Sequence, residues 1–405
     1  MRVLFLTSEF PYPPFGGAPL RNYGLIKGLA EEHEIWLLSF RSEVALPPEQ
    51  TPLHTFCTAI ETVPAPARTR GDRIRDLLAG HADIARRFDS EAFREKLDHW
   101  LASQRFDLIQ IENLEMTIYL PTIKVRQPDT PVIYDAHNAE YALQQRIFET
   151  ERRSLAHLPG ALYSLVQARR VRAMERAVCN AVDHVIAVSD TDAEHLQRLK
   201  ADTPITVVPN GISTDLYLQP VPDPVELEQP ALVFTGKMDY RPNVDAALWF
   251  AEEILPLIRQ EIANTHFYVV GQSPHPRLDV LRGQPGITIT GLVPRVLPYL
   301  QAASIFVVPL RMGSGTRLKV LEAMAAHCAV VSTRIGAQGL GAEDGQELIL
   351  ADTTREFARA VIRLLKDPAQ ARALGANAQT FARERYDWQV LLPRLKDVYA
   401  EITRG

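Results

Sequence analysis

The segment Met312–Ala325 carries the clearest chemical signal in the sequence. A buried strand is predicted to end at Pro309, a loop of glycine and serine follows, and a helix starts near Arg317. Arg317 and Lys319 fall in the first helical turn, where the helix dipole is already positive and each cation is unfavourable by roughly 0.3–1 kcal/mol. A bound diphosphate would make both cations favourable, because its negative charge reverses the sign of the interaction. The segment therefore predicts an anion site.

Glu322 follows Lys319 by three residues and lies on nearly the same face of this helix. Two interpretations are open. The carboxylate could form only an intrahelical ion pair with Lys319, or it could accept hydrogen bonds from the two hydroxyls of a ribose beside the phosphates. The second interpretation would extend the anion site into a nucleotide site.

Two further cations, Lys237 and Arg241, occupy the loop that leaves the first predicted strand of the second half of the chain. They could be solvated surface groups. Their shared position at the carboxyl end of a strand favours an anion contact instead.

Polar side chains also gather after the predicted strand Val132–Tyr134, where Asp135, His137, Asn138 and Glu140 follow in quick succession. A lone histidine is usually structural, but four polar groups at the end of a buried strand favour a functional site. Further upstream, Gly16 and Gly17 stand between the first strand and a helix.

Paired glycines let a backbone approach a ligand, and a helix start offers free N–H groups to an anion, although a plain strand-to-helix turn is the alternative. By its chemistry alone, Asn210-Gly211 is a structural turn.

Short apolar runs alternate with helical patterns along the whole chain and predict the elements that position these residues. Strands are predicted at Val3–Thr7, Glu34–Ser39, Leu108–Ile111, Val132–Tyr134, His184–Val188, Ile205–Val208, Ala231–Thr235, Phe267–Gly271, Ile287–Gly291, Ile305–Pro309, Ala329–Thr333 and Glu347–Leu350. Helices are predicted at Leu20–Glu31, Arg169–Asn180, Val244–Ile258 and Thr354–Leu365. A proline-rich linker, residues 218–230, separates the halves. The pattern predicts two doubly wound α/β domains with a ligand enclosed between them.

Composition narrows the class of protein. A chain of 405 residues with 46% hydrophobic and 23% charged residues is typical of a soluble two-domain protein, and its net charge of -5 disfavours nucleic acid as a partner. Three scattered cysteines predict neither disulfides nor a thiolate metal site, which fits a cytoplasmic location. The first apolar run is too short for a signal peptide, and no run is long enough to span a membrane. A G-x-G-x-x-G fingerprint is absent after the first strand of either half, which disfavours a dinucleotide dehydrogenase.

Together the motifs resemble the family 4 retaining glycosyltransferases, which have the GT-B fold of two Rossmann-like domains facing each other across a cleft. The resemblance covers essentially the whole chain. Its motifs are Gly16-Gly17, Asp135-Ala136-His137-Asn138, Val208-Pro209-Asn210-Gly211-Ile212, Val320-Leu321-Glu322-Ala323-Met324-Ala325 and the stretch from Arg385-Tyr386-Asp387-Trp388 to Tyr399. It implies an acceptor-side domain at 1–217, a donor-binding domain at 231–387, and a last helix, about 388–405, that packs back on the first domain.

The resemblance also implies roles for single residues. Glu322 corresponds to the second glutamate of the family's E-x7-E motif, which holds the ribose, and His137 to the histidine beside the transferred sugar. Gly16 and Gly17 correspond to the loop that reaches the diphosphate, and Lys237 stands in place of an arginine of the diphosphate-binding pair.

The sequence departs from the family's pattern at two positions. Ser314 replaces the first glutamate of E-x7-E, and the usual second cation falls at Pro242. Arg241, Arg317 and Lys319 are candidates to restore the charge, and Ser314 puts the choice of donor sugar in question. The residues expected to act in catalysis are His137, Lys237 and Glu322. The residues expected to bind substrate are Gly16, Gly17, Asp135, Asn138, Arg241, Ser314, Gly315, Thr316, Arg317, Lys319 and Leu321.

The implied reaction is transfer of a sugar, with retention of configuration, from a UDP or GDP sugar to a glycan, a lipid-linked or a small-molecule acceptor, as in cell-surface polysaccharide synthesis. No cofactor or metal is expected. An epimerase or phosphorylase of the same fold, or a non-catalytic sugar-nucleotide-binding subunit, would fit the same motifs.

An arginine-rich segment could contact the inner face of an anionic membrane, or could be a solvated helix face. That segment comprises Arg68, Arg70, Arg73, Arg75, Arg86 and Arg87, with Leu77 and Leu78 among them.

Overall fold

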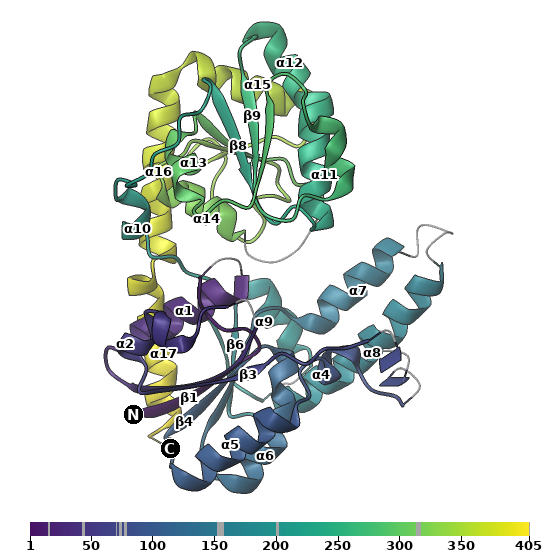
Figure 1. Ribbon diagram of the computed structural model, residues 1–405, viewed down its shortest axis with the longest axis vertical. Helices are drawn as coiled ribbons and strands as arrows, with labels where there is room; N and C mark the ends of the chain where they lie inside the picture. Colours follow the sequence, from purple (N-terminus) through teal and green to yellow (C-terminus); the bar gives the residue numbers. More distant parts are fainter. Residues whose placement is uncertain are drawn as a thin grey trace. The chain divides into compact units, whose positions relative to one another are not determined.

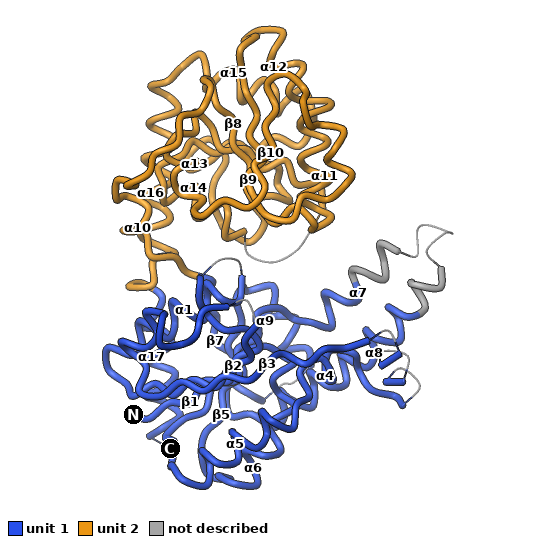
Figure 2. Tube along the Cα trace, viewed as in Figure 1, with its two compact units in different colours: residues 1–210, 391–405 blue, residues 211–390 orange. Residues whose placement is uncertain are grey.

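The computed structural model describes residues 1–14, 17–42, 45–69, 71–72, 75–76, 79–151, 158–199, 202–312 and 317–404. Two units divide the chain. Residues 1–210 and 391–405 form unit 1, and residues 211–390 form unit 2 (Figure 2). The division at residue 210 precedes the predicted linker, which therefore belongs to unit 2.

Unit 1 is built on a seven-stranded parallel sheet with the order β3-β2-β1-β4-β5-β6-β7 (Figure 1). Its strands are β1 (Arg2–Thr7), β2 (Glu34–Arg41), β3 (Ala59–Pro64), β4 (Leu108–Glu112), β5 (Val132–Ala136), β6 (His184–Ala187) and β7 (Ile205–Val207). Each apolar run predicted as a strand here contains one. The strand β3 was not predicted, because it lies at the edge of the sheet and most of its residues are only half-buried.

Helices and short 3-10 helices (η) connect these strands. They are α1 (Gly17–Leu29), η1 (Pro48–Gln50), α2 (Leu53–Phe56), α4 (Asp83–Arg86), α5 (Glu91–Ser103), η2 (Leu114–Tyr119), α6 (Leu120–Arg126), α7 (Glu140–Glu151), α8 (Leu158–Ala181) and α9 (Asp190–Gln197). The serines before α5 and α9 cap them, since Ser90 and Ser189 accept hydrogen bonds from N–H groups of the first turn. The helices α7 and α8 pair as a hairpin that extends from the edge of unit 1 (Figure 1).

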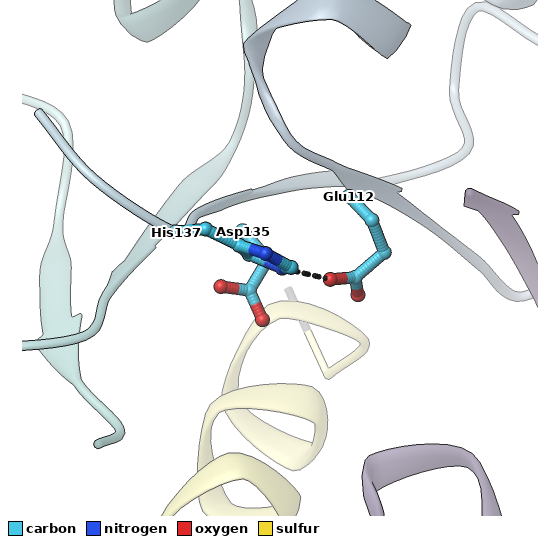
Figure 3. Close-up of side chains that lie close together, drawn as sticks. All are labelled: Glu112, Asp135 and His137. Atoms are coloured by element: carbon cyan, nitrogen blue, oxygen red, sulfur yellow. Dashed lines mark hydrogen bonds and ion pairs between the residues drawn. The ribbon is translucent and has the colours of Figure 1, made fainter. Parts of the chain in front are cut away.

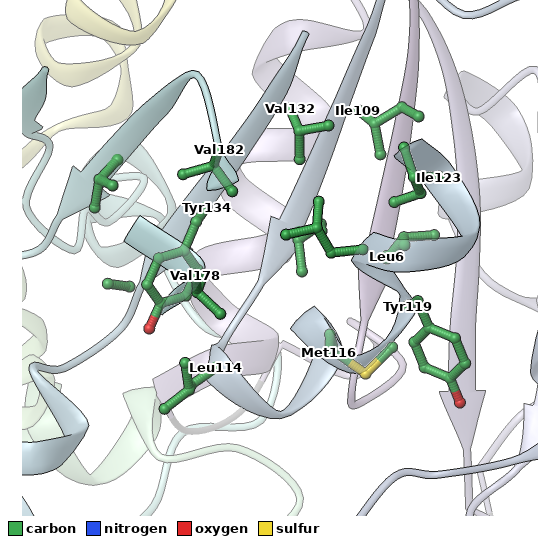
Figure 4. Packing of buried hydrophobic residues seen from close by; sticks show 14 of the residues in the cluster. Leu6, Ile109, Leu114, Met116, Tyr119, Ile123, Val132, Tyr134, Val178 and Val182 are labelled. Atoms are coloured by element: carbon green, nitrogen blue, oxygen red, sulfur yellow. The ribbon is translucent and has the colours of Figure 1, made fainter. Parts of the chain in front are cut away.

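The core of unit 1 lies between its sheet and these helices. Leu6, Ile109 and Tyr134 of the central strands have no exposed surface and share one cluster with Ile123 of α6 and Val178 of α8 (Figure 4). All five residues of β4 and of β5 are buried, so side chains on both faces of the sheet are covered. This is the pattern expected of a doubly wound parallel sheet.

The last helix, α17 (Trp388–Ile402), belongs to unit 1 over most of its length. Leu392 packs so closely on α1 that a Cβ added at Gly28 would lie 2.0 Å from its Cδ1 atom. Lys396 also pairs with Glu32 at 2.7 Å. The end of the chain therefore completes unit 1.

Unit 2 contains a six-stranded parallel sheet with the order β10-β9-β8-β11-β12-β13. Its strands are β8 (Ala231–Thr235), β9 (His266–Val270), β10 (Ile287–Gly291), β11 (Ile305–Val308), β12 (Val330–Ser332) and β13 (Ile349–Leu350). Its helices are α10 (Asp215–Leu218), α11 (Arg241–Trp249), the π-helix η4 (Phe250–Ile254), α12 (Leu255–Glu261), η5 (Pro276–Leu281), α13 (Leu297–Ala302), α14 (Leu318–Ala325), α15 (Thr354–Lys366) and α16 (Pro368–Tyr386).

One predicted helix is divided in the structure. The stretch Val244–Ile258 runs through α11, η4 and α12. Pro256 has no N–H to donate to an α-helical ladder, and the hydrogen-bond pattern changes to the π form just before it.

Each sheet reverses its strand order once, between β1 and β4 in unit 1 and between β8 and β11 in unit 2. Ligands of doubly wound folds bind beyond the carboxyl ends of the strands at such a switch point. The residues that follow these strands are therefore the candidates for ligand contacts.

Candidate functional site

A buried cluster of three titratable side chains lies at the switch point of unit 1 (Figure 3). Glu112 is the last residue of β4, Asp135 belongs to the neighbouring strand β5, and His137 follows β5 by one residue. The Nε2 atom of His137 lies 2.8 Å from Oε2 of Glu112. The parallel pairing of β4 with β5 sets this arrangement, because it places Glu112 directly beside Asp135.

Arg21 of α1 supplies the counter-charge to this cluster. Its Nε and Nη2 atoms donate to both oxygens of Asp135 at 2.8–3.1 Å, and neither side chain has any exposed surface. Its Nη1 atom donates to the carbonyls of Val208 and Pro209 and to Oδ1 of Asn210. The residues of the predicted turn at Asn210 thus also accept hydrogen bonds from the buried guanidinium of Arg21.

Two neutral side chains complete the network. Gln110 of β4 donates from Nε2 to Oε1 of Glu112 at 2.6 Å and more weakly to Asp135 at 3.4 Å. Tyr399 of α17 donates its hydroxyl proton to Oε1 of Gln110. The last helix therefore reaches the cluster through Gln110.

Burial sets the proton states of the cluster. It raises the pKa of Glu112 to about 7, against the opposing attraction of Arg21. Burial likewise raises the pKa of Asp135 to about 6 and lowers the pKa of His137 to about 4. Near neutral pH the imidazole is neutral, and Glu112 can exchange a proton.

Oxygen and nitrogen atoms of Glu112, Asp135 and His137 lie within 4.8 Å of one another, a spacing that could hold a metal ion. The hydrogen-bond partners disfavour one, because both oxygens of Asp135 already accept from the Arg21 guanidinium. A cation at this position would add a second positive charge beside a buried arginine.

The other polar residues after β5 make local contacts. Nδ2 of Asn138 donates to Glu140 at 3.3 Å. The backbone N–H groups of Glu140 and Tyr141 donate to the buried carboxylate of Glu175 on α8, which caps the start of α7. This contact joins the start of α7 to α8.

In unit 2, Lys237 lies in the loop after β8, whereas Arg241, predicted in the same loop, is the first residue of α11; both side chains are exposed. Lys237 pairs with Asp239 at 3.5 Å, an exposed contact of the kind that contributes little to stability. Gly236 and Gly271 let the loops after β8 and β9 touch, since a Cβ at Gly271 would lie 1.7 Å from the Gly236 carbonyl oxygen. This close approach fixes the backbone from which Lys237 extends.

The first turn of α14 lies against the same loop. The Nζ atom of Lys319 donates to Oδ1 of Asn243 at 2.8 Å, and Nδ2 of Asn243 donates to the carbonyl of Lys237 at 2.9 Å. The Lys319 ammonium also lies 4.4 Å from the centre of the Phe234 ring. Burial, and then the like charge of Arg317, lower the pKa of Lys319 to about 7. A nearby anion would raise that pKa again.

Glu322 has a partner that the sequence did not indicate. The hydroxyl of Tyr217 on α10 donates to its Oε1 atom at 3.0 Å. Burial raises the pKa of Glu322, while Tyr217 and Lys319 oppose that rise. The predicted intrahelical pair with Lys319 has no direct hydrogen bond among the described residues, since Lys319 points to Asn243.

Arg317 stands just before α14, buried, with its guanidinium 3.4 Å from the carbonyl of Ile335. Leu321 has no exposed surface and lies on the core side of α14.

Gly17 is the first residue of α1. Gly16, Ser314, Gly315 and Thr316, which carry several of the predicted contacts, lie outside the described residues.

An open cavity of about 350 Å³ also lies in unit 2. It follows the carboxyl ends of β11, β12 and β13 and is lined by Leu310, Arg311, Thr333, Arg334, Ile335 and Asp352. Arg311 is paired with Asp245, and Arg334 with Asp352, so both cations of the cavity are already neutralised.

The arginine-rich segment of unit 1 is largely neutralised by aspartates where it is described. Arg68 pairs with Asp76 and Asp83 at 2.5 and 2.9 Å. Arg75, Arg86 and Arg87 each pair with an aspartate as well. Arg70, Arg73, Leu77 and Leu78 lie outside the described residues. Across the described parts of the chain, no helix combines the length and the apolar character needed to cross a membrane.

Solved structures define the class of fold. Sucrose-phosphate synthase from Thermosynechococcus elongatus superposes with a TM-score of 0.72 at 18% identity over the whole of both chains. HepE of Anabaena, solved with UDP and glucose, superposes with a TM-score of 0.64 at 15% identity, over 99% of this chain and 100% of that one. With its two doubly wound units, the chain has the GT-B fold.

The family follows from the sequence. Residues 15–216 match the family described as "Glycosyltransferase Family 4". Residues 229–367 match the family described as "Glycosyl transferases group 1". The chain belongs to the family 4 glycosyltransferases.

Curated relatives are distant. Alpha-maltose-1-phosphate synthase of Mycolicibacterium smegmatis is 26% identical over 267 residues, which are 57% of this chain and 66% of that protein. An uncharacterized 44.6 kDa protein from the cps region of Klebsiella pneumoniae is 25% identical over 173 residues, 41% of this chain and 45% of that protein. The matches thus span from under half to about two thirds of these relatives.

Proposed function

We propose that the protein transfers a sugar from a nucleoside diphosphate sugar to an acceptor hydroxyl. The observation that carries this proposal is the geometry around Asn243, which joins Lys319 to the loop of Lys237, with Glu322 one turn further along α14. Cations and a carboxylate are thereby gathered at the switch point of unit 2. Those are the groups that a diphosphate and a ribose require.

Lys237 and Arg241 are the proposed contacts of the diphosphate, together with Arg317 and Lys319. Their exposure supports this role for the first two, because the weak pair with Asp239 leaves Lys237 easily available. Glu322 would hold the ribose through the oxygen that Tyr217 does not occupy.

The cations would stabilise the leaving diphosphate as its charge develops, in place of a metal ion. The sugar carbon would pass through an oxocarbenium-like state. We propose retention of configuration, by attack from the side of the leaving phosphate, as the family resemblance implies. His137 is the proposed contact of the transferred sugar in unit 1, with Asp135 and Asn138 beside it.

The names of the relatives support transfer over an epimerase, a phosphorylase or a non-catalytic subunit, since two are called synthases. HepE was solved with UDP, which supports a UDP sugar as donor, with a GDP sugar as the alternative. The relative from a cps region supports a glycan or lipid-linked acceptor in surface polysaccharide synthesis. Contact of residues 68–87 with a membrane stays a prediction, which the paired arginines make weaker.

Incubation of the protein with UDP and GDP sugars and a panel of acceptors tests the proposal through release of nucleoside diphosphate. We expect acceptor-dependent release that is undiminished in EDTA, because protein cations replace a metal. The anomeric configuration of the product, measured by NMR, is expected to match that of the donor. Loss of turnover in EDTA would contradict the metal-independent mechanism, and absence of release with every donor would contradict the transferase.

Replacing Glu322 by alanine is expected to weaken binding of the nucleoside diphosphate by about 1.5–3 kcal/mol, the range for hydrogen bonds to a charged group. Isothermal titration calorimetry measures this loss. Glu252→Ala, which removes an exposed carboxylate of the same unit, is the matched control and is expected to bind normally. Unchanged affinity in the folded Glu322→Ala variant would contradict the ribose assignment.

A further inference from the structure

Glu112 occupies a special place in unit 1 that the family motifs do not explain. It is the last residue of β4, beside the point where the strand order reverses. The next residue, Asn113, has φ 69° and ψ 155°, a backbone conformation that residues other than glycine rarely adopt. Its Nδ2 atom donates to the hydroxyl of Ser8 after β1. The end of β4 is thus held in a strained conformation at the place where a ligand is expected.

The carboxyl group of Glu112 has two hydrogen-bond partners among the described residues. Nε2 of Gln110 donates to Oε1, and Nε2 of His137 faces Oε2 at 2.8 Å. Arg21 makes no hydrogen bond to Glu112, because its donors are directed at Asp135 and at residues 208–210. The imidazole is therefore the partner with which Glu112 shares a proton.

The neighbours of Gln110 favour one orientation of its amide. Its Oε1 atom accepts from the hydroxyl of Tyr399, and its Nε2 atom faces the carboxyl groups of Glu112 and Asp135. A flipped amide would place its oxygen against two carboxyl groups. In this orientation Oε1 of Glu112 is an acceptor, so a proton on this carboxyl group belongs on Oε2, toward His137.

The other ring nitrogen of His137 remains for a ligand. Nδ1 has no hydrogen-bond partner among the described residues, and the side chain keeps 10% of its surface exposed. In both proton states of Glu112, the Nε2 atom stays engaged. A hydrogen bond between His137 and a substrate must therefore be made by Nδ1.

We propose that Glu112 is a positioning residue that selects the tautomer of His137, so that ionised Glu112 makes Nδ1 a hydrogen-bond acceptor for a hydroxyl of the substrate. This inference rests on the proposed function, because it takes His137 to face the sugar or the acceptor. An ionised Glu112 accepts from Nε2–H and leaves Nδ1 bare. A protonated Glu112 donates to Nε2 and moves the ring proton to Nδ1, which then becomes a donor.

The charged and titratable groups around this pair come from several elements. Asp135 of β5 and Glu115 of η2 raise the pKa of His137, while Arg21 of α1 lowers it, and burial outweighs all three. Tyr399 of α17 faces the cluster with its pKa raised well above 10, so it stays neutral. Glu112 is therefore the group whose proton decides the tautomer near neutral pH, since its own pKa is raised to about 7.

Glu112→Gln is the decisive variant. Its amide oxygen must accept from Gln110, since the opposite orientation would set two NH₂ groups against each other. The NH₂ group of the new side chain then has to donate to Nε2 of His137. This forces the ring proton onto Nδ1 at every pH at which the ring is neutral, without a change in side-chain size.

The tautomer is measured by NMR of protein labelled with ¹⁵N-histidine, and the His137 signals are assigned from their absence in His137→Gln. We expect a bare Nδ1 in the wild type above neutral pH and a protonated Nδ1 in Glu112→Gln. The kcat is expected to fall by about 10- to 100-fold, because a substrate hydroxyl that donates to Nδ1 would meet a donor instead. The affinity for nucleoside diphosphate is expected to stay unchanged.

Glu115→Gln is the matched control. It removes a nearby carboxylate charge without touching His137, and it is expected to keep the wild-type tautomer and the wild-type kcat. A similar loss of kcat in both variants would overturn the proposal, because a charge effect would then suffice. A wild-type tautomer in Glu112→Gln would also overturn it.

The wild type supplies a test that needs no variant. As pH falls through the titration of Glu112, the Nδ1 signal is expected to change from the bare to the protonated form while the ring stays neutral. Protonation of both nitrogens in that step would overturn the proposal. Because these spectra require no substrate, they decide the tautomer even if the wild type releases no nucleoside diphosphate, which would count against the proposed function alone.

Discussion

Replacing Arg21 by leucine is expected to destabilise unit 1 by about 3–5 kcal/mol, the usual cost of removing one partner from a buried ion pair. Arg21 and Asp135 are both without exposed surface, and no other cation contacts Asp135 among the described residues. The variant would also leave the carbonyls of Val208 and Pro209 without this donor. Urea denaturation, combined with hydrogen exchange of the β5 and α1 amides, measures the loss in unit 1.

The loss is expected to depend on pH. Burial raises the pKa of Asp135 to about 6 although Arg21 opposes it, so removal of Arg21 raises that pKa further. The folded variant then binds a proton that the unfolded chain has released, and its stability falls as pH rises. The deficit relative to the wild type should therefore be larger near pH ~8 than below pH ~6.

Arg198→Leu is the matched control for Arg21→Leu. Arg198 pairs with Glu194 at 3.7 Å, and both side chains are mostly exposed, so a change below about 1 kcal/mol is expected. If Arg21→Leu and Arg198→Leu lower the free energy of unfolding equally, the buried network around Arg21 does not stabilise unit 1.

Replacing Lys237 by alanine is expected to lower kcat on the order of 10²–10³-fold, as when one preorganised donor to a developing negative charge is removed. The reason is the proposed contact with the leaving diphosphate. The exposed side chain makes only the pair with Asp239, so the fold should be unaffected. Turnover at saturating donor, together with the melting temperature, measures the two effects separately.

Lys366→Ala provides the comparison for Lys237→Ala. Lys366 is a similarly exposed lysine of unit 2, paired with Glu261 and remote in sequence from the loops at the switch point. It is expected to keep normal turnover. Near-normal kcat in Lys237→Ala would remove Lys237 from the catalytic assignment and leave Lys319 and Arg317 to carry the charge.

The strands of both sheets could be predicted because they are short, continuous apolar runs, as buried parallel strands must be. The edge strand β3 could not, since Glu61 and Thr62 interrupt its apolar character. The proline at 256 was visible in the sequence, but the π-helix before it was not, because hydrogen-bond patterns within a helix leave no periodic signal.

The candidate site was predictable where its residues lie at or just after the carboxyl end of a strand, as Asp135, His137 and Lys237 do. Their partners were not. Arg21 and Asp135 are separated by 114 residues, and Tyr399 and Gln110 by 289, so only the folded sheet brings them together. Glu112 ends a strand as Asp135 nearly does, and that shared position was the signal by which it could have been found.

The role of Tyr217 was harder to predict from the sequence than that of Glu112. It lies 105 residues before Glu322, in a short helix beside the proline-rich stretch, and nothing in its neighbourhood indicated a hydroxyl donor. Nothing in the sequence indicated the role of Asn243, whose amide joins Lys319 to the Lys237 loop. Amide and hydroxyl side chains of this kind carry no charge pattern, and their roles become visible only in three dimensions.

The return of α17 to unit 1 has a consequence for synthesis of the chain. Unit 2 is one continuous stretch, whereas unit 1 needs residues 391–405, which are translated after unit 2. At about 5–20 residues per second, translation of unit 2 occupies on the order of 10–40 s, during which Gln110 lacks Tyr399 and α1 lacks Leu392. Unit 2 can thus complete its sheet first, although it is encoded second. A stop codon that removed residues 391–405 would therefore damage unit 1, most of which is encoded before unit 2.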